Sequence, residues 1–230
     1  MSGPKITILY EDNHLLVVEK PVNVPTQGDA SGDPDLLSLL KQDLKVRYQK
    51  PGQVYLGLVH RLDRPVGGVM VFAKTSKAAS RLAEQLRTGG FQKTYLAVVH
   101  GHLEKKGHLE HFLAKDRAAN RVQVVSPTEP GGKKAILDYE VLAEKEGLSL
   151  VRVQLRTGRA HQIRVQFSAL GHPLYGDQKY GAALNKPGQQ IALWSHRIVL
   201  RHPTKKEEMS FSSSPPAWAP WDLFPNQTWE

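Results

Sequence analysis

The 230-residue sequence contains no cysteine. Disulfides, thiolate metal sites and a cysteine nucleophile are therefore excluded. No apolar run approaches the ~18 residues that a membrane-spanning helix needs. The N-terminus also lacks the cationic and apolar segments of a signal peptide. We expect a cytoplasmic protein without a membrane partner.

Three common motifs of catalysis and nucleotide binding are also missing. The sequence has no G-x-x-x-x-G-K-[ST] loop and no G-x-G-x-x-G that opens a helix. It has no G-x-S-x-G turn, which excludes the usual serine-hydrolase arrangement. We therefore expect chemistry that uses no nucleotide cofactor.

Positive charge is abundant. The formal net charge is +9 at pH 7 and the sequence pI is about 9.7. Such an excess favours an anionic partner, most often nucleic acid, although some basic proteins do not bind RNA. The length allows one large domain or two small ones. We predict a single domain over residues 1–230.

The apolar pattern predicts more strands than helices. Strands are expected over residues 6–10, 15–20, 55–62, 68–74, 93–101, 133–144, 148–156 and 191–202. Helices are expected from Asp33-Pro34 to about Tyr48, after a Ser76 cap to Gly89 or Gly90, and over 160–170. Strands and helices mostly do not alternate, so we predict an α+β fold with a largely antiparallel sheet. The tail, residues 213–230, gives no prediction.

One carboxylate stands among bases in the stretch HRLDRPVGG, residues 60–68. Asp63 lies between Arg61 and Arg64, close to His60, and a turn-forming Pro-x-Gly-Gly follows. An arginine held against a carboxylate keeps it ionised and orients it. An ionised, oriented aspartate can act as a nucleophile or a base.

A second basic stretch, LRTGRAHQIR, ends at Arg164. It places three arginines and a histidine at a strand-to-helix turn, which Thr157 is expected to cap. Positive side chains and backbone N–H groups at one point suit an anionic group. Arg164 and Asp63 together form a candidate catalytic pair, and the alternatives are a structural ion pair and an exposed basic turn.

Four histidines lie within twelve residues at positions 100, 102, 108 and 111. A zinc hydrolase can use an H-x-H pair, and Glu104 and Glu110 offer further ligands. The alternative, which we prefer, is a solvated hairpin that binds no metal.

Six segments, in order, resemble the RluA-type family of RNA pseudouridine synthases. The resemblance covers about residues 6–212 and rests on ILYEDNHLLVVEKP, GLVHRLDRPVGGVMVFAKT, KTYLAVVHG, DYEVL, RTGRAHQIRVQFSALGHPLYGDQKYG and HRIVLRHP. It implies the pseudouridine synthase fold, a bent, mixed, mostly antiparallel sheet with flanking helices and a central active-site cleft. It also implies isomerisation of uridine to pseudouridine in RNA, without a cofactor or metal.

The resemblance assigns roles to individual residues. It implies that Asp63 is the catalytic aspartate, that Tyr95 packs on the target base, and that Arg164 pairs with the aspartate. Arg61 matches the residue that can fill the gap left by the base, which must be flipped out before it can react. The other expected RNA-binding residues are His60, Arg64, Lys93, Arg156, Arg159 and His161.

The sequence also departs from the family pattern. Val66-Gly67-Gly68 replaces the usual Thr-Ser-Gly, and Gly67 is expected to adopt a conformation that serine disfavours. The matching pattern begins by about residue 6, so no N-terminal S4-type domain is expected, and substrate choice would fall to residues such as Lys105, Lys106, Lys115, Arg117 and Arg121. The rival interpretation is a non-catalytic RNA-binding or ribosome-assembly factor. The target, ribosomal or transfer RNA, is left open, and a monomer is expected.

Overall fold

The computed structural model describes residues 4–116 and 119–225. The chain forms two compact units. The first comprises Met1–Lys93 and Ser195–Ser213, and the second comprises Thr94–Trp194 and Ser214–Glu230. The chain passes between them three times: inside the strands β5 (Gln92–His100) and β10 (Leu193–Arg201), and again after Ser213.

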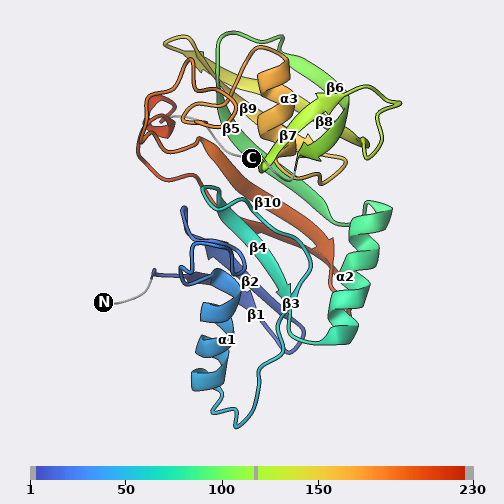
Figure 1. Cartoon of the computed structure of the whole chain (residues 1–230). Coiled ribbons are helices and arrows are strands. Elements are labelled where there is room, and N and C mark those ends of the chain that lie inside the picture. Colours follow the sequence, from blue (N-terminus) through green and yellow to red (C-terminus); the bar gives the residue numbers. More distant parts are fainter. Residues whose placement is uncertain (1–3, 117–118, 226–230) are drawn as a thin grey trace. The chain divides into compact units, whose positions relative to one another are not determined.

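The first unit is a small sheet with two helices (Figure 1). Its other elements are β1 (Thr7–Glu11), β2 (Leu15–Lys20), α1 (Leu36–Arg47), β3 (Gly57–Leu58), β4 (Gly67–Ala73), α2 (Ser76–Thr88) and β11 (Glu208–Ser212). The strand order is β1-β2-β4-β10, with β3 paired to β4 and β11 paired to β10. The β1–β2, β2–β4, β3–β4 and β10–β11 pairs are antiparallel.

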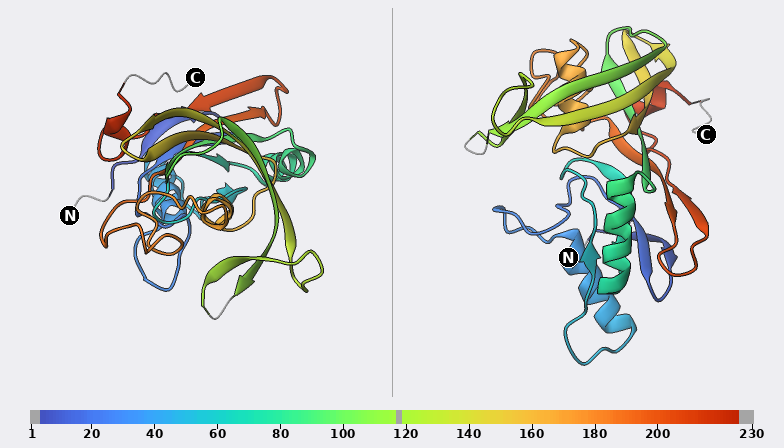
Figure 2. Two further views of the ribbon diagram at one scale, coloured as in Figure 1. Left: turned by 90° about the horizontal axis from the view of Figure 1, so that it is seen from above. Right: turned by 90° about the vertical axis from the view of Figure 1, so that its right-hand side faces the viewer.

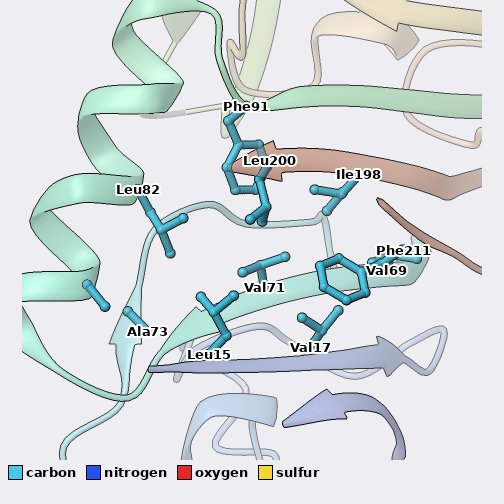
Figure 3. Packing of buried hydrophobic residues seen from close by; sticks show 11 residues of the cluster. Leu15, Val17, Val69, Val71, Ala73, Leu82, Phe91, Ile198, Leu200 and Phe211 are labelled. Atoms are coloured by element: carbon cyan, nitrogen blue, oxygen red, sulfur yellow. The ribbon is translucent and has the colours of Figure 1, made fainter. Parts of the chain in front are cut away.

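Alternating side chains of these strands form the core of the first unit. Leu15 and Val17 pack with Val71, Leu82 of α2 and Ile198 on one face of the sheet (Figure 3). The intervening residues of β2 and β4 point to the opposite face and are also fully buried; they are Leu16, Val18, Met70 and Phe72. Both faces of these two strands are therefore covered.

Two helix caps differ from those predicted. The N-cap of α1 is Asp35, whose carboxylate accepts from the Ser38 N–H, and not Asp33. The N–H of Leu36 donates to the Pro25 carbonyl at 2.8 Å, so the preceding loop fixes where the helix begins. Thr75, not Ser76, caps α2 by accepting from the Ala78 N–H, and α2 ends at Gly89 in the left-handed conformation as predicted.

The second unit is a strongly curved sheet with one helix (Figure 2). Its other elements are β6 (Lys106–Asp116), β7 (Arg121–Val125), β8 (Lys133–Lys145), β9 (Leu148–Leu155), α3 (Gln162–Ala169) and a 3₁₀ turn, η1 (Trp221–Leu223). The strand order is β5-β9-β8-β6-β7, and the neighbouring pairs are antiparallel. Val165 of α3 packs with Leu113, Val122 and Ala135, so the helix contacts the β6–β7 hairpin.

The structure confirms the α+β class and the largely antiparallel pairing, and it corrects several details. The strand expected over 55–62 shrinks to β3, because from Val59 to Val66 the chain forms the loop that carries Asp63. Strands β6, β7 and β11 were not predicted. The unassigned tail buries Trp221 and Phe224. The single-domain organisation stays a prediction. Over residues 4–116 and 119–225, the longest helices are too short and too polar to cross a bilayer.

Candidate active site

Asp63 lies on the loop between β3 and β4 and is half-buried. Its carbonyl accepts a hydrogen bond from the Val66 N–H at 3.0 Å, which closes a turn over Arg64 and Pro65. The turn therefore comprises Asp63–Val66, and Gly67 and Gly68 of the predicted Pro-x-Gly-Gly turn already belong to β4. The turn leads from the aspartate straight into β4.

Lys20 lies behind this turn and is completely buried. Its ammonium group donates to the carbonyls of Pro21 and Arg64, both at 3.0 Å. Burial lowers the pKa of Lys20 to about 7, and the nearby charge of Asp63 acts in the opposite direction. Lys20 thus fixes the backbone immediately after Asp63 and supplies a positive charge that attracts the Asp63 carboxylate.

Arg64 makes contacts that the sequence did not predict. Its guanidinium binds the Ser31 hydroxyl at 3.0 Å and the carboxylate of Asp33, and it lies 3.8 Å from Asp29. These partners are on the Pro/Gly-rich loop before α1. Arg64 is still exposed, but in this structure its charge is balanced by that loop.

The other expected RNA-binding residues of the first unit differ in exposure. Arg61 is exposed. His60 accepts a hydrogen bond at Nε2 from the Val71 N–H at 3.0 Å, and its Nδ1 is buried. Burial lowers the pKa of His60 to about 3, with a smaller contribution from the charge of Lys93. Lys93 is half-buried, and burial lowers its pKa. His60 is therefore a neutral residue that fixes the loop to β4.

The unusual backbone conformation next to Asp63 belongs to Gly68 and not to Gly67. Gly68 has φ +111°, and a Cβ there would collide with the carbonyl oxygen of Ser195 in β10. Gly67 is absent from the positive-φ residues of the described chain. Val66, where the family has threonine, is buried in the core. At position 66, apolar packing thus takes the place of a threonine hydroxyl.

Tyr95 lies in β5, opposite Val153 of β9, and is buried. It belongs to the second unit, as does Arg164, whereas Asp63 belongs to the first. The three predicted catalytic residues thus come from both units.

Arg164, in the first turns of α3, is buried and forms a bidentate ion pair with Asp177. Its Nε donates to Oδ2 and its Nη2 to Oδ1, both at 2.8 Å. The side chain of Asp177 is 0% exposed. Its Oδ1 also accepts from the N–H groups of Lys179 and Tyr180 at 3.0 and 3.1 Å. This carboxylate is therefore fixed by the backbone of its own turn.

Tyr180 lies against the same arginine. The guanidinium carbons of Arg164 and Arg121 each lie 5.2 Å from the Tyr180 ring centroid. The Tyr180 hydroxyl accepts from the Val122 N–H at 2.9 Å and contacts His161 Nδ1 at 2.6 Å. Tyr180 thus joins α3, the loop after it and the β6–β7 hairpin.

The basic turn before α3 is held by several local contacts. Arg156 Nε donates to Asp138 at 2.7 Å, and Arg159 Nε donates to the Lys134 carbonyl at 2.9 Å. Thr157 does not cap the helix as predicted; its hydroxyl accepts from the Ile136 N–H and donates to Gln162. The N-cap is His161, in the left-handed conformation. Arg156 and Arg159 lie near the surface.

The four histidines at positions 100–111 have separate partners. They contact Asn185, Glu144, Asp138 and Gln166 respectively. Over residues 4–116 and 119–225, no three potential ligands come together as a metal site would require. Arg117, a candidate for substrate choice, lies outside the described residues.

Sequence analysis missed Lys20, Asp177 and Tyr180. A lysine at the end of a buried strand was the available signal for Lys20. Asp177 and Tyr180 stood in the quoted segment GHPLYGDQKYG, but nothing in their spacing indicated Arg164 as their partner.

Comparison with known proteins gives consistent results. The model of the family described as RNA pseudouridylate synthase matches residues 14–169. An uncharacterised RNA pseudouridine synthase, YhcT, of Bacillus subtilis is 38% identical over 207 residues, covering 88% of this chain and 66% of that protein. Ribosomal large subunit pseudouridine synthase D of Zymomonas mobilis is 33% identical over 221 residues, covering 92% of this chain and 69% of that protein. The chain thus spans about two thirds of the length of these relatives.

Solved structures agree with the sequence comparisons. Human RNA pseudouridylate synthase domain containing 4 superposes with a TM-score of 0.76 at 25% identity, covering 91% of this chain and 88% of that one. Human RNA pseudouridylate synthase domain containing 1 gives 0.73 at 26% identity, covering 93% and 85%. The predicted fold is therefore confirmed.

Proposed function

The chain belongs to the RNA pseudouridylate synthase family, whose members are RNA-modifying isomerases, and we propose that it converts uridine to pseudouridine with Asp63 as the catalytic residue. The N1–C1′ bond of uridine breaks and a C5–C1′ bond forms. The hydrogen on C5 leaves as a proton and N1 gains one, so the reaction is balanced without a redox partner. We propose that no cofactor or metal takes part.

The environment of Asp63 is the observation that carries this proposal. The carboxylate is half-buried on a closed turn, and Lys20 holds that turn from behind through two carbonyls. A fixed carboxylate close to a buried positive charge suits a nucleophile or a base. The exposed neighbour Arg61 is our candidate for filling the space that the flipped nucleotide leaves.

Tyr95 and Arg164 complete the proposed catalytic set. An aromatic ring stacked on a base contributes about 1–3 kcal/mol, which offsets part of the cost of flipping. The planar fork of an arginine orients a carboxylate better than a lysine does. We therefore propose that Tyr95 holds the uracil and that Arg164 orients Asp63, as the family resemblance implies.

The substrate is RNA, and we propose that basic side chains of the protein bind its phosphates. Arg156 and Arg159 near the surface, together with Lys105, Lys106, Lys115 and Arg121, are our candidates for phosphate contacts. Of the two RNA classes, we propose ribosomal RNA, because several relatives are named for the large ribosomal subunit. The monomeric state and the cytoplasmic location stay predictions.

Tritium release tests the proposal directly. Ribosomal and transfer RNA transcripts would be labelled at uracil C5, because joining C5 to the sugar must expel that hydrogen. We expect release with the wild-type protein and at least a 10³-fold lower rate with Asp63→Ala, since removing a catalytic group costs this much or more.

Asp43→Ala is the matched control. Asp43 is a surface carboxylate on α1 that pairs with Arg47, so its loss should leave turnover unchanged. Release by Asp63→Ala at the wild-type rate would refute the catalytic assignment. RNA binding without release by the wild-type protein would favour the non-catalytic RNA-binding factor instead.

A further inference from the structure

The guanidinium of Arg164 is fixed on one edge and on one face. Nε and Nη2 form the edge that binds Asp177, so Nη1 lies on the side turned away from this carboxylate. The Tyr180 ring lies 5.2 Å from the guanidinium carbon. A planar group with an edge and a face fixed keeps one orientation.

Asp177 is also held in place by groups other than Arg164. Two backbone N–H groups of its own turn bind Oδ1, and the amide of Asn185 donates to the Asp177 carbonyl at 3.3 Å. The carboxylate therefore cannot follow a displaced arginine without breaking its turn. Asp177 is therefore the rigid member of the Arg164–Asp177 pair.

Stability alone is a poor explanation for this arrangement. A fully buried ion pair loses much of its Coulomb energy to desolvation, and an apolar pair of similar volume is often equally stable. Fixing the direction of a charged group is a role that an apolar pair could not perform. The fork between Arg164 and Asp177 has the geometry for that role.

We propose that Asp177 and Tyr180 are positioning residues that hold Arg164 in the orientation needed for catalysis. This inference rests on the proposed function, because it takes Arg164 as the residue that orients Asp63. Neither residue is assigned a role by the resemblance or by the relatives. Both act through Arg164 and need not touch the substrate.

Tyr180 also connects this position to the β6–β7 hairpin. Its hydroxyl binds the Val122 backbone, Arg121 lies against its ring, and Lys179 donates to the Asn120 carbonyl at 2.8 Å. Arg121 is among the candidate RNA contacts. The position of the Tyr180 ring against Arg164 therefore depends on the β6–β7 hairpin, which is expected to contact RNA.

Asp177→Asn is the first test, with steady-state tritium release as the measurement. The asparagine keeps the shape and one oxygen but presents N–H groups to a donor, so the two-point fork between Arg164 and residue 177 is broken. We expect kcat to fall at least about 10-fold while KM stays within about 3-fold, because the loss concerns the chemical step. Gln178→Ala, an exposed change in the same turn, should leave both constants unchanged.

A second pair of variants covers the case in which Asp177→Asn does not fold. Tyr180→Phe keeps the ring against Arg164 and loses the hydroxyl, whereas Tyr180→Leu loses both. We expect Tyr180→Leu to lower kcat at least about 5-fold below Tyr180→Phe. Equal kcat values in these two variants would overturn the role of Tyr180.

An activity-independent measurement separates this inference from the proposed function. The Nε–H of an arginine held in a buried fork exchanges slowly and gives its own ¹⁵N NMR signal. We expect that signal for wild-type Arg164 and its loss in Asp177→Asn. An unchanged signal, or unchanged kcat in folded Asp177→Asn, overturns the inference. Wild-type protein that gives the signal but releases no tritium refutes the proposed function and leaves the positioning result standing.

Discussion

Lys20 carries a charge in a place where charge is costly. Its side chain is fully buried, with two carbonyls as acceptors, and burial lowers its pKa to about 7 from about 10.5. Between these two pH values the unfolded chain binds a proton at this lysine and the folded chain does not. Lys20 therefore makes folding more favourable as pH rises from about 7 to about 10. Below about pH 7 its contribution is constant and least favourable.

Lys20→Met provides the test of this dependence. The difference in unfolding free energy between wild type and variant should change in favour of wild type by up to about 1.4 kcal/mol per pH unit across this window. Denaturant unfolding followed by tryptophan fluorescence at pH 6, 7, 8 and 9 would measure it. Lys45→Met, at an exposed position of α1, should show no such trend. A constant difference for Lys20→Met would mean that burial does not lower the pKa of Lys20.

The candidate site also shows what sequence can predict about single residues. Asp63 and Arg164 were singled out by their charged neighbours and by the family resemblance, and Tyr95 by the resemblance alone; Asp63 begins the turn that closes on Val66. The partners that hold them were not predictable, because Asp177 is thirteen residues from Arg164 and reaches it only through a loop. The sequence predicted Arg64 to be an RNA contact, but its guanidinium binds Asp33, on a loop more than thirty residues away in the chain.

Glycine determines how closely two strands can approach at the start of β4. Gly68 has positive φ, and a Cβ there would meet Ser195 backbone atoms on β10. We expect Gly68→Ala to destabilise the protein by more than about 3 kcal/mol, because conformational strain adds to a backbone clash. Thermal or urea unfolding would measure the loss.

Gly89→Ala is the matched variant for this change. Gly89 also has positive φ, but no atom lies within 4 Å of its added Cβ, so only the conformational cost of about 1 kcal/mol applies. Equal losses in the two variants would show that the close approach of Ser195 does not matter.

Elements were predictable where one pattern dominated. β2, β8 and β9 begin at the predicted residues, since β2 opens with four consecutive apolar residues and apolar residues recur at every second position over much of β8 and β9. β6 was missed because polar His111 occupies the inward position between Leu109 and Leu113. Its Nδ1 accepts a hydrogen bond from Gln166, which satisfies the polar group that broke the pattern. The N-cap of α1 was assigned to the wrong residue because three aspartates, Asp29, Asp33 and Asp35, precede the helix. Only the contacts of the preceding loop show which of them is the cap.

The whole chain carries a net charge of +9, and its proposed substrate, RNA, is a polyanion. If about five RNA phosphates are neutralised on binding, the affinity should fall about 100-fold between 50 and 200 mM salt. Fluorescence anisotropy with a labelled transcript would measure the slope of log K against log salt. The value of kcat at saturating RNA should change little. A slope near zero would contradict binding through phosphates.

Composition predicted the partner class and patterns predicted the α+β class. The division into two compact units was not predicted, because no linker marks it. Two of the three boundaries fall inside regular strands, where hydrogen bonding continues and the sequence shows only a strand; the third follows β11. Single-sequence patterns report the local state of the backbone, and they contain no information on which distant strands become neighbours.

The discontinuous first unit has a consequence for synthesis. Leu15 and Val17 emerge from the ribosome early, but their core partners Ile198, Leu200 and Phe211 are translated near the end of the chain. At about 5–20 residues per second, the intervening stretch of the second unit takes on the order of 5–20 s to make. During that interval the nascent β2 and β4 lack the strand β10 that completes their sheet. The unit that carries Asp63 is thus begun first but completed only after most of the second unit has been made, and its unfinished sheet is a natural client for chaperones.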